Sequence, residues 1–432
     1  MHSTALTSMT TAPAAGYRRV VTPFQVFCLG VNAIVGSGIF LLPGRIDALL
    51  GAAAVWSFVA AALGLAPIAL AFAALGRRFE RDGGPYLYAA AAFGPRAGYA
   101  VGWVAWGTAV VSWAAVATAV AAYLAVFVPA AGRDGAEHWI GALVVLVLAT
   151  INVRGVRLGA RVMTLLTIAK SAPLVLVALV ALPHLDPERL DVFAPAGGSW
   201  AGFPAALWMA LFACQGFEVA PIIAGEVRGA RRAVPVAVVG ALGFSAAVYI
   251  ALQLCVSAGP VALAGSERPL SDLAHALAGP AGSTFVAAAA LLSILGYNAG
   301  TALSGAHYLT VLAEDGFLPR VLAARHPRFA TPAPAILLTA GATMAFALAA
   351  VFERLIAISV LAVVLQYAAA TGSLLALRYR EGGRRIHRGL IVPALGLLVS
   401  LAFLAQARPA DALVFGAVLA VGIGAAFLYR RA

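Results

Sequence analysis

Long apolar runs restrict the fold of this chain more than any other feature. A helix needs about 20 apolar residues to cross the hydrocarbon core of a bilayer, and such runs recur along the whole 432-residue sequence. The chain is 62% hydrophobic and 11% charged, whereas a soluble globular domain is about 25% charged. So few charged groups cannot cover a water-facing surface. The sequence therefore predicts an all-α membrane protein without a separate soluble domain.

Twelve apolar stretches are predicted to be transmembrane helices. They cover residues 24–42, 52–75, 97–128, 139–153, 158–182, 203–224, 234–258, 283–313, 333–352, 355–377, 390–405 and 410–429. We divide the chain into a cytoplasmic tail (1–23), helices 1 to 5 (24–182), helices 6 to 10 (203–379), and helices 11 and 12 with the C-terminal end (388–432).

The basic residues predict the orientation, because cytoplasmic loops retain Lys and Arg. If the tail is inside, 22 of the 29 basic residues fall on the inner face, six fall on the outer face, and Lys170 lies within a span. We therefore expect a multi-pass protein of the cell's inner (plasma) membrane with both termini in the cytoplasm and with lipid around it. The net charge is +12, but the basic residues lie in short clusters between spans, so the charge does not indicate nucleic-acid binding.

Two of the predicted spans carry residues that weaken a helix. The first contains Gly-Ser-Gly-Ile-Phe at 36–40, and the sixth contains Gln-Gly-Phe-Glu at 215–218, followed by Pro221. A single glycine in a membrane helix is often explained by close helix packing. However, Ser37 and Gly216 are 179 positions apart, which is the length of five spans. Interrupted helices at corresponding places in two halves indicate an inverted repeat with a binding site near the membrane midplane.

A pair of broken helices has a direct chemical consequence. Each break leaves N–H groups at the start of one half-helix and C=O groups at the end of the other without partners. The N–H groups, at the positive end of the half-helix dipole, attract a carboxylate, and the carbonyls can hold an ammonium. Non-helical backbone at this depth is tolerated where it lines a cavity. The pattern predicts a site for a zwitterion such as an α-amino acid.

At these residues the chain resembles the amino acid-polyamine-organocation (APC) transporter superfamily, in its bacterial amino-acid permease branch. The matching motifs are Gly36-Ser37-Gly38-Ile39-Phe40 with Pro43-Gly44, Gly83-Gly84-Pro85-Tyr86-Leu87-Tyr88, Ala92-Phe93-Gly94-Pro95 leading to Gly102-Trp103, Gly216-Phe217-Glu218, and Glu314-Asp315-Gly316-Phe317-Leu318-Pro319-Arg320. The resemblance implies a leucine-transporter-type fold with helices 1 to 5 and 6 to 10 as inverted repeats. It also implies alternating access, with amino-acid exchange or proton-coupled symport.

The resemblance also implies the roles of particular residues. The substrate carboxylate would meet N–H groups around Ser37 and Gly38, the ammonium would meet carbonyls of helices 1 and 6, and aromatic residues of helix 6 would gate the site. The expected site comprises Ile34, Gly36, Ser37, Gly38, Ile39, Thr108, Phe212, Ala213, Gln215, Gly216 and Phe217. The family usually shows a Lys/Arg-Asn-Pro-x-Arg run after the sixth helix, whereas this chain has Arg-Gly-Ala-Arg-Arg at 228–232. This departure concerns the inner mouth.

Two charged residues inside predicted spans are candidates for coupling, because an ionisable group in the membrane is costly. Lys170 lies nine residues beyond Arg161, about 13 Å at a rise of about 1.5 Å per residue, which is near the midplane. Related transporters place a lysine of helix 5 close to the broken first helix. Lys170 is interpreted either as a coupling residue or as a structural cation that donates to freed carbonyls. Glu218 is interpreted either as a proton sensor or as a hydrogen-bond acceptor.

The absence of acidic groups from the third span predicts a neutral substrate. Cationic amino-acid members of the family carry a Glu at about the position of Thr108, and a second substrate charge without a partner would be costly to bury. The alternatives are an exporter or exchanger of another small amine or organic cation and, more remotely, a membrane-embedded enzyme or a channel. The spans contain no HExxH, GxSxG or paired-Asp motif, so we expect no enzyme activity, cofactor or metal.

Overall fold

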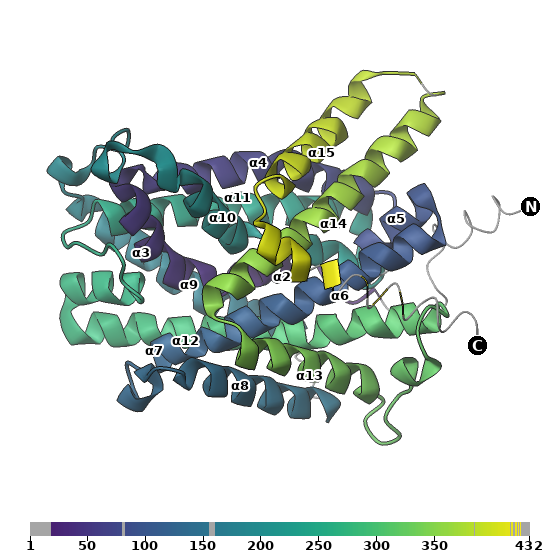
Figure 1. The fold of residues 1–432 in the computed structure, drawn as a ribbon, viewed down its shortest axis with the longest axis horizontal. Helices are drawn as coiled ribbons and strands as arrows, with labels where there is room; N and C mark the ends of the chain where they lie inside the picture. The colour runs from purple at the N-terminus through teal and green to yellow at the C-terminus, as the bar shows by residue number, and fades with distance from the viewer. Residues whose placement is uncertain are drawn as a thin grey trace, which may run out of the picture.

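The computed structural model describes residues 19–79, 83–154, 160–383, 385–414, 416, 417, 420, 422 and 424. Long helices lie side by side along the longest axis of the molecule, with α15 and the end of α14 diverging from the rest (Figure 1). The described residues form helices and no strand, with one isolated bridge between Val21 and Val227. Much of the predicted tail and half of the predicted twelfth span lie outside the described residues.

The described helices include eight stretches that are long and apolar enough to cross a membrane. These are Gly38–Gly76, Pro95–Leu124, Ala136–Val153, Thr164–His184, Trp200–Glu226, Ala230–Ser257, Pro269–Glu314 and Phe352–Glu381. Three shorter apolar helices accompany them, at Pro23–Ile34, Ala333–Ala349 and Arg388–Leu404. The all-helical, multi-pass character predicted from the sequence is confirmed.

The helices mostly follow the predicted spans, with differences at their ends. They are α2 (Pro23–Ile34), α3 (Gly38–Leu50), α4 (Val55–Gly76), α5 (Pro85–Phe93), α6 (Pro95–Thr118), α7 (Val120–Leu124), α8 (Ala136–Val153), α9 (Ala160–Ala181), α10 (Phe203–Cys214), α11 (Ala230–Ser257), α12 (Pro269–Glu314), α13 (Ala333–Ala349), α14 (Phe352–Glu381) and α15 (Ile391–Leu404). A 3-10 helix, η7, covers Phe217–Glu226.

Two elements differ from the spans that hydropathy alone suggests. The stretch predicted at 97–128 divides into α6 and the short α7. Helix α12 begins well before residue 283, but its backbone leaves the helical conformation at Ala278 and at Gly279, where φ is 63°. Pro280 follows this kink, and because proline cannot donate a backbone hydrogen bond, it favours a break there.

The start of α2 is encoded locally. Thr22 Oγ1 accepts a hydrogen bond from the Gln25 amide at 3.3 Å, and Gln25 Oε1 accepts one from the Thr22 amide at 2.9 Å. This reciprocal pair is a capping box, and Pro23 occupies the first helical position, where its missing N–H costs nothing. The first broken helix therefore begins at a sequence-defined point.

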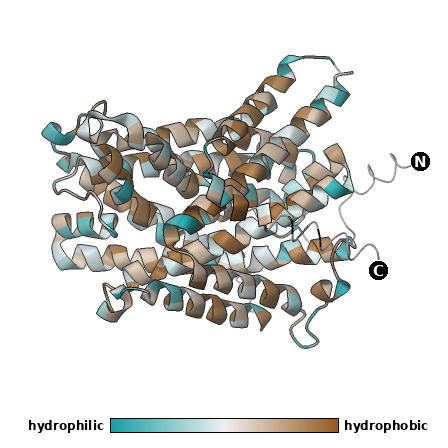
Figure 2. Cartoon of the chain, viewed as in Figure 1, coloured by the Kyte–Doolittle hydropathy of each residue, from teal (hydrophilic) through white to brown (hydrophobic). Residues whose placement is uncertain are grey.

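Buried and exposed apolar surfaces divide as expected for a membrane bundle. Helix α11 packs against α2 and α4, while α6 packs against α5, α12 and α14. On the outer surface, Leu63 and Leu179 are 70% and 63% exposed, and hydrophobic residues are frequent along the helices (Figure 2). Because water would disfavour so much exposed apolar surface, these faces are suited to lipid.

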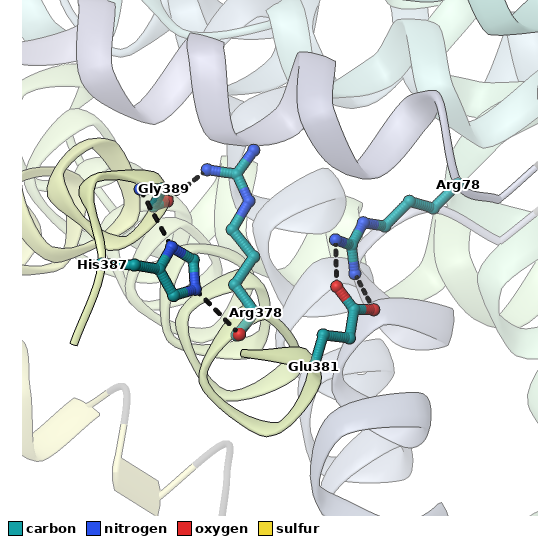
Figure 3. Close-up of polar contacts among 5 residues, drawn as sticks. All are labelled: Arg78, Arg378, Glu381, His387 and Gly389. Atoms are coloured by element: carbon teal, nitrogen blue, oxygen red, sulfur yellow. Dashed lines mark hydrogen bonds and ion pairs between the residues drawn. The ribbon is translucent and has the colours of Figure 1, made fainter. Parts of the chain in front are cut away.

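Polar contacts tie together one end of α4, α14 and the turn before α15 (Figure 3). The Arg78 guanidinium forms a two-pronged ion pair with the Glu381 carboxylate, with N–O distances of 2.8 and 2.7 Å. Arg378 donates to the Gly389 carbonyl at 2.5 Å, and the Gly389 amide donates to His387 Nδ1 at 3.1 Å. This end carries the arginines that the charge pattern assigns to the cytoplasm.

Candidate substrate site

The first predicted helix is interrupted between α2 and α3. Helix α2 ends at Ile34 and α3 begins at Gly38. The amides of Phe40 and Leu41 both donate to the Ser37 carbonyl, at 3.0 and 3.1 Å. The amides of Gly38 and Ile39, which precede them, have no acceptor within their own helix. The Ser37 hydroxyl is fully buried and has no hydrogen-bond partner among the described residues.

The sixth predicted helix is interrupted between α10 and η7. Helix α10 ends at Cys214, and Gln215 is extended, with φ −70° and ψ 157°. Gly216 has a φ of 126°, a conformation that residues with a Cβ rarely adopt. The last carbonyls of α10 therefore lack the continuing helix that would supply their amide donors. This interruption lies where Gln215 and Gly216 predicted it.

The two interruptions contact each other directly. A Cβ placed on Gly38 would lie 2.9 Å from the Ala213 Cα, and one placed on Gly216 would lie 2.8 Å from the Ile34 amide nitrogen. Only glycine permits these approaches. The predicted site residues are also closed off from solvent, since even the most exposed, Thr108 and Glu218, are 7% and 8% exposed.

Lys170 bonds to the broken part of helix 1. Its fully buried ammonium donates to the Asn32 carbonyl at 2.8 Å and to the Val35 carbonyl. One turn earlier on α9, the Thr167 hydroxyl donates to the Cys28 carbonyl at 3.1 Å. These are the contacts that a cation donating to freed carbonyls would make, and they join α9 to α2 along one face.

Two hydroxyl groups that the sequence analysis did not identify also donate hydrogen bonds to carbonyls at the break in helix 1. Tyr249 on α11 donates to the Ile34 carbonyl at 3.2 Å. Ser293 on α12 donates to the Val35 carbonyl at 3.2 Å. The only sequence signal for either was a hydroxyl group in an apolar span, which is too common in membrane helices to identify a site.

Glu218 bonds within the sixth helix and to α14. Its Oε2 accepts the Gly216 amide at 2.9 Å and the Tyr367 hydroxyl at 2.8 Å. The Phe217 ring stacks on the Tyr367 ring, with centroids 5.1 Å apart. Glu218 therefore holds the positive-φ turn of Gly216 against α14, while Lys170 bonds to carbonyls of helix 1. The two charged groups have separate partners.

A group of polar side chains lies between α6, α14 and the end of α10. Gln215 Nε2 donates to Ser359 Oγ at 2.9 Å and to Ser112 Oγ at 3.4 Å, and the two serine oxygens are 2.6 Å apart. We call Ser112, Gln215 and Ser359 the hydroxyl cluster. One turn before Ser112 on α6, the Thr108 hydroxyl accepts from Gln366 Nε2 at 2.6 Å. Sequence reasoning identified Gln215 and Thr108 but not their partners on α14.

Phe212 lies on the other side of the interruption from Phe217. Its ring packs edge-on against Phe352 at the start of α14, with centroids 6.3 Å apart. The Arg45 guanidinium of α3 lies 5.5 Å from the same Phe352 ring and pairs with the Glu353 carboxylate. The contacts near Phe212 therefore join α3, α10 and α14 on the face that the charge pattern places outside.

The loop after η7 closes against the chain that precedes α2. The Val21 amide donates to the Glu226 carbonyl at 3.0 Å, and the Arg228 amide donates to the Val21 carbonyl at 2.8 Å. Arg228 also donates through Nε to the Arg19 carbonyl at 3.1 Å. The sequence at 228–232, which departs from the usual family run, thus takes part in a backbone pairing at the expected inner face.

In the part of the chain that the structure describes, no cluster of cysteine, histidine or acidic residues forms a candidate metal site. No three His, Cys, Asp or Glu side chains gather there as candidate ligands. Cys28, Cys214 and Cys255 are buried and free. The chemistry available at the interruptions is that of backbone amides and carbonyls, hydroxyls, one ammonium and one carboxylate.

Comparisons with known proteins identify the family. A family model described as amino acid permease matches residues 21–425. An uncharacterised transporter of Mycobacterium tuberculosis is 31% identical over 426 residues, covering 96% of this chain and 92% of that protein. The serine/threonine exchanger SteT of Bacillus subtilis is 26% identical over 429 residues, covering 96% and 97%. The methylthioribose transporter of Bacillus subtilis is 25% identical over 330 residues, covering 73% and 71%.

These matches agree with the motifs that suggested the resemblance. The family model spans both interrupted helices and nearly the whole chain, and the named relatives are transporters. The chain is therefore a transporter rather than an enzyme, with a small-molecule substrate. It belongs to the amino acid permease family of the APC superfamily.

Proposed function

We propose that this protein is a secondary transporter for a neutral amino acid. It works by alternating access in the bacterial inner membrane, either as a proton-coupled symporter or as an exchanger. The observation that carries the proposal is the direct contact of two helix interruptions, at Gly38 with Ala213 and at Gly216 with Ile34. Helices 1 to 5 and 6 to 10 form the inverted repeats of a twelve-helix fold with the boundaries given above, and both termini are cytoplasmic.

The substrate carboxylate binds at the start of α3. The amides of Gly38 and Ile39 are not used within that helix, and the positive end of its dipole attracts an anion. The Ser37 hydroxyl, buried without a partner among the described residues, supplies a further donor. The Tyr297 ring and Ala213 lie against Gly36 and Gly38, so the carboxylate reaches this backbone when those neighbours move apart.

The substrate ammonium binds mainly at the end of α10. The carbonyls of Phe212 and Ala213 fall in the last turn, where a helix leaves acceptors unused. The Ile34 carbonyl, expected from the family pattern to share this role, already accepts hydrogen bonds from Tyr249 and from the Gly36 amide. Since a carbonyl has two lone pairs, an ammonium at Ile34 has to displace one of these donors.

Lys170 and Glu218 couple proton loss or gain to movement of the two broken helices. Lys170 bonds to two carbonyls of helix 1, so loss of its proton weakens the attachment of that helix to α9. Glu218 bonds to the Gly216 amide and to Tyr367, so gain of a proton weakens the attachment of helix 6 to α14. Either change biases the position of a broken helix, which is what coupling by alternating access requires.

A neutral substrate and an exchange mode are supported by different observations. The side chains of the hydroxyl cluster are uncharged, and Thr108 bonds to Gln366 at the position where cationic-substrate members of the family carry an acid. A second positive charge on the substrate would be buried without a partner. The similarity to a serine/threonine exchanger over 96% of this chain supports exchange as the mode.

The proposal is tested with purified protein in two assays. A thermal-shift screen of the twenty amino acids, with small amines as a second panel, is expected to show stabilisation by neutral amino acids only. Uptake of the best ligand into proteoliposomes is expected to saturate and to rise when the same amino acid is loaded inside. The Gly38→Val variant, which crowds the carboxylate position against Ala213, is expected to lose binding. Stabilisation by amines alone, or unchanged affinity in Gly38→Val, contradicts the proposal.

A further inference from the structure

We propose that the hydroxyl cluster of Ser112, Gln215 and Ser359 is a subsite that recognises a hydroxyl group on the substrate side chain. This inference rests on the proposed function and narrows its substrate class to short, hydroxyl-bearing neutral amino acids such as serine and threonine. The cluster joins three elements that a moving helix 6 would separate or bring together, because Gln215 follows α10, Ser112 lies on α6 and Ser359 lies on α14.

The cluster adjoins both helix interruptions. Gln215 is itself the residue between Cys214, where α10 ends, and the turn at Gly216. Gly216 in turn contacts the first interruption, because a Cβ placed on it would lie 2.8 Å from the Ile34 amide nitrogen. A substrate whose charged groups bind at the two interruptions therefore places its side chain within reach of these hydroxyls.

The cluster has an unused polar atom. Gln215 is 6% exposed, and its Oε1 has no partner among the described residues, although its Nε2 donates to both serines. Reversing the amide would leave the nitrogen unused instead of the oxygen, because the serines meet only one end of the group. A buried polar atom without a partner is costly. Since such atoms in native proteins are usually satisfied, this one indicates a ligand.

A hydroxyl group suits the unpartnered Gln215 atom better than the alternatives. It both donates and accepts, so it satisfies Gln215 in either orientation of the amide. The hydrogens of Ser112 and Ser359 can rotate to meet it, because either oxygen can be the donor of their mutual bond. A charged substrate group would find no counter-ion in the cluster, and a methyl group would leave the amide atom unsatisfied.

The close approach of the interruptions limits the size of the side chain. Gly38 leaves too little space for even a Cβ beside Ala213, and Ala213 is two residues before Gln215. Ser112 and Ser359 are 3% and 0% exposed. Because these groups are closely packed, a short side chain such as that of serine or threonine requires less movement of the surrounding helices than a long amide or an aromatic ring.

The test compares substrates that differ only in the hydroxyl. Threonine and valine have nearly the same shape, and serine and alanine form a second pair. In proteoliposomes, wild-type uptake efficiency (kcat/KM) is expected to be at least about tenfold higher for threonine than for valine, because a site built to bond a hydroxyl rejects the analogue without it. Thermal shifts of wild-type protein are expected to give the same order, which requires no variant to fold.

Serine-to-alanine variants test which residues distinguish threonine from valine. Ser112→Ala and Ser359→Ala are each expected to lower threonine uptake and bring the threonine/valine ratio to about threefold or less. The control is Ser373→Ala on α14, whose buried hydroxyl donates to the Ala369 carbonyl within its own helix at 2.6 Å. That variant is expected to keep the wild-type ratio.

The outcomes separate this inference from the proposed function. If wild-type protein carries valine or alanine as well as threonine or serine, or if both cluster variants keep the wild-type ratio, the subsite assignment is wrong while amino-acid transport stands. If no amino acid is bound or transported, the proposed function fails and the subsite fails with it.

Discussion

Gly216 of the sixth helix lies directly against the backbone carbonyl of Ala33 in the first. A side chain on Gly216 would overlap that carbonyl, and the residue already has a φ of 126°. Two interruptions that are far apart in the sequence therefore share one contact surface. Any motion of helix 6 relative to helix 1 has to slide or open this contact.

The Gly216→Ala substitution is expected to destabilise the protein by at least about 2 kcal/mol, because it combines an unfavourable backbone conformation with a steric overlap. Melting in detergent, followed by fluorescence-detected gel filtration, measures the effect. The control is Gly243→Ala in α11, where a Cβ would meet no atom within 4 Å. Since alanine is the better helix former, the control is expected to be neutral or stabilising by up to about 1 kcal/mol. Equal stability of the two variants would contradict the observed contact.

Replacement of Lys170 by methionine is expected to lower transport at least about tenfold. Methionine fills a similar volume but cannot donate. The Asn32 carbonyl then loses its Lys170 donor, at about 1–3 kcal/mol for an unsatisfied buried group, while the Val35 carbonyl keeps the Ser293 hydroxyl. Initial uptake rates across a range of pH values provide the measurement. Thr167→Val, which removes a neutral hydrogen bond one turn away on the same helix, is expected to have a smaller effect. Unchanged rates and an unchanged pH profile in the methionine variant would remove Lys170 from the mechanism.

The Tyr367→Phe substitution isolates the contact between Glu218 and α14. It removes one donor from a buried carboxylate while keeping the ring that stacks on Phe217. The free energy of unfolding is expected to fall by about 1.5–3 kcal/mol, the range for hydrogen bonds to charged groups. Glu218→Gln, which retains an oxygen acceptor for the Gly216 amide, is expected to fold and to alter the pH dependence of uptake. A pH profile identical to wild type in Glu218→Gln would leave Glu218 with a structural role only.

The predicted orientation can be tested by thiol labelling. The three native cysteines are buried, so engineered cysteines at exposed positions should react above a low background. In spheroplasts, a membrane-impermeant maleimide is expected to label Arg133→Cys directly and Arg380→Cys only after permeabilisation. The reverse pattern would invert the topology and place the termini outside.

Sequence patterns located the interruptions correctly because helix-weakening residues act locally. Gly216 adopts a positive φ, Gln215 ends the helical backbone, and Gly38 starts α3. The capping box of Thr22 and Gln25 is likewise a matter of residues three positions apart. Hydropathy was less informative about helix ends, as the division of α6 from α7 and the kink at Gly279 show, because a change of backbone direction need not change polarity.

The partners of the site residues could not be inferred in the same way. Gln215 stands out in an apolar span, but its contacts with Ser112 and Ser359 depend on how α6 and α14 pack. Tyr249, Ser293 and Tyr367 are ordinary residues of membrane helices until their hydroxyls are placed against freed backbone or a buried carboxylate. Each of these contacts joins residues more than 100 positions apart.

The sequence by itself determined that this chain is a helical membrane protein, where two of its helices break, and to which family it belongs. These follow from apolar run length, local backbone preference and motif content, all of which act within a few tens of residues. Only the tertiary structure decided that the two breaks touch, that Lys170 bonds to helix 1 while Glu218 bonds to α14, and that two serines surround Gln215. The reason is that the close packing of distant helices, rather than any local pattern, selects which polar groups meet.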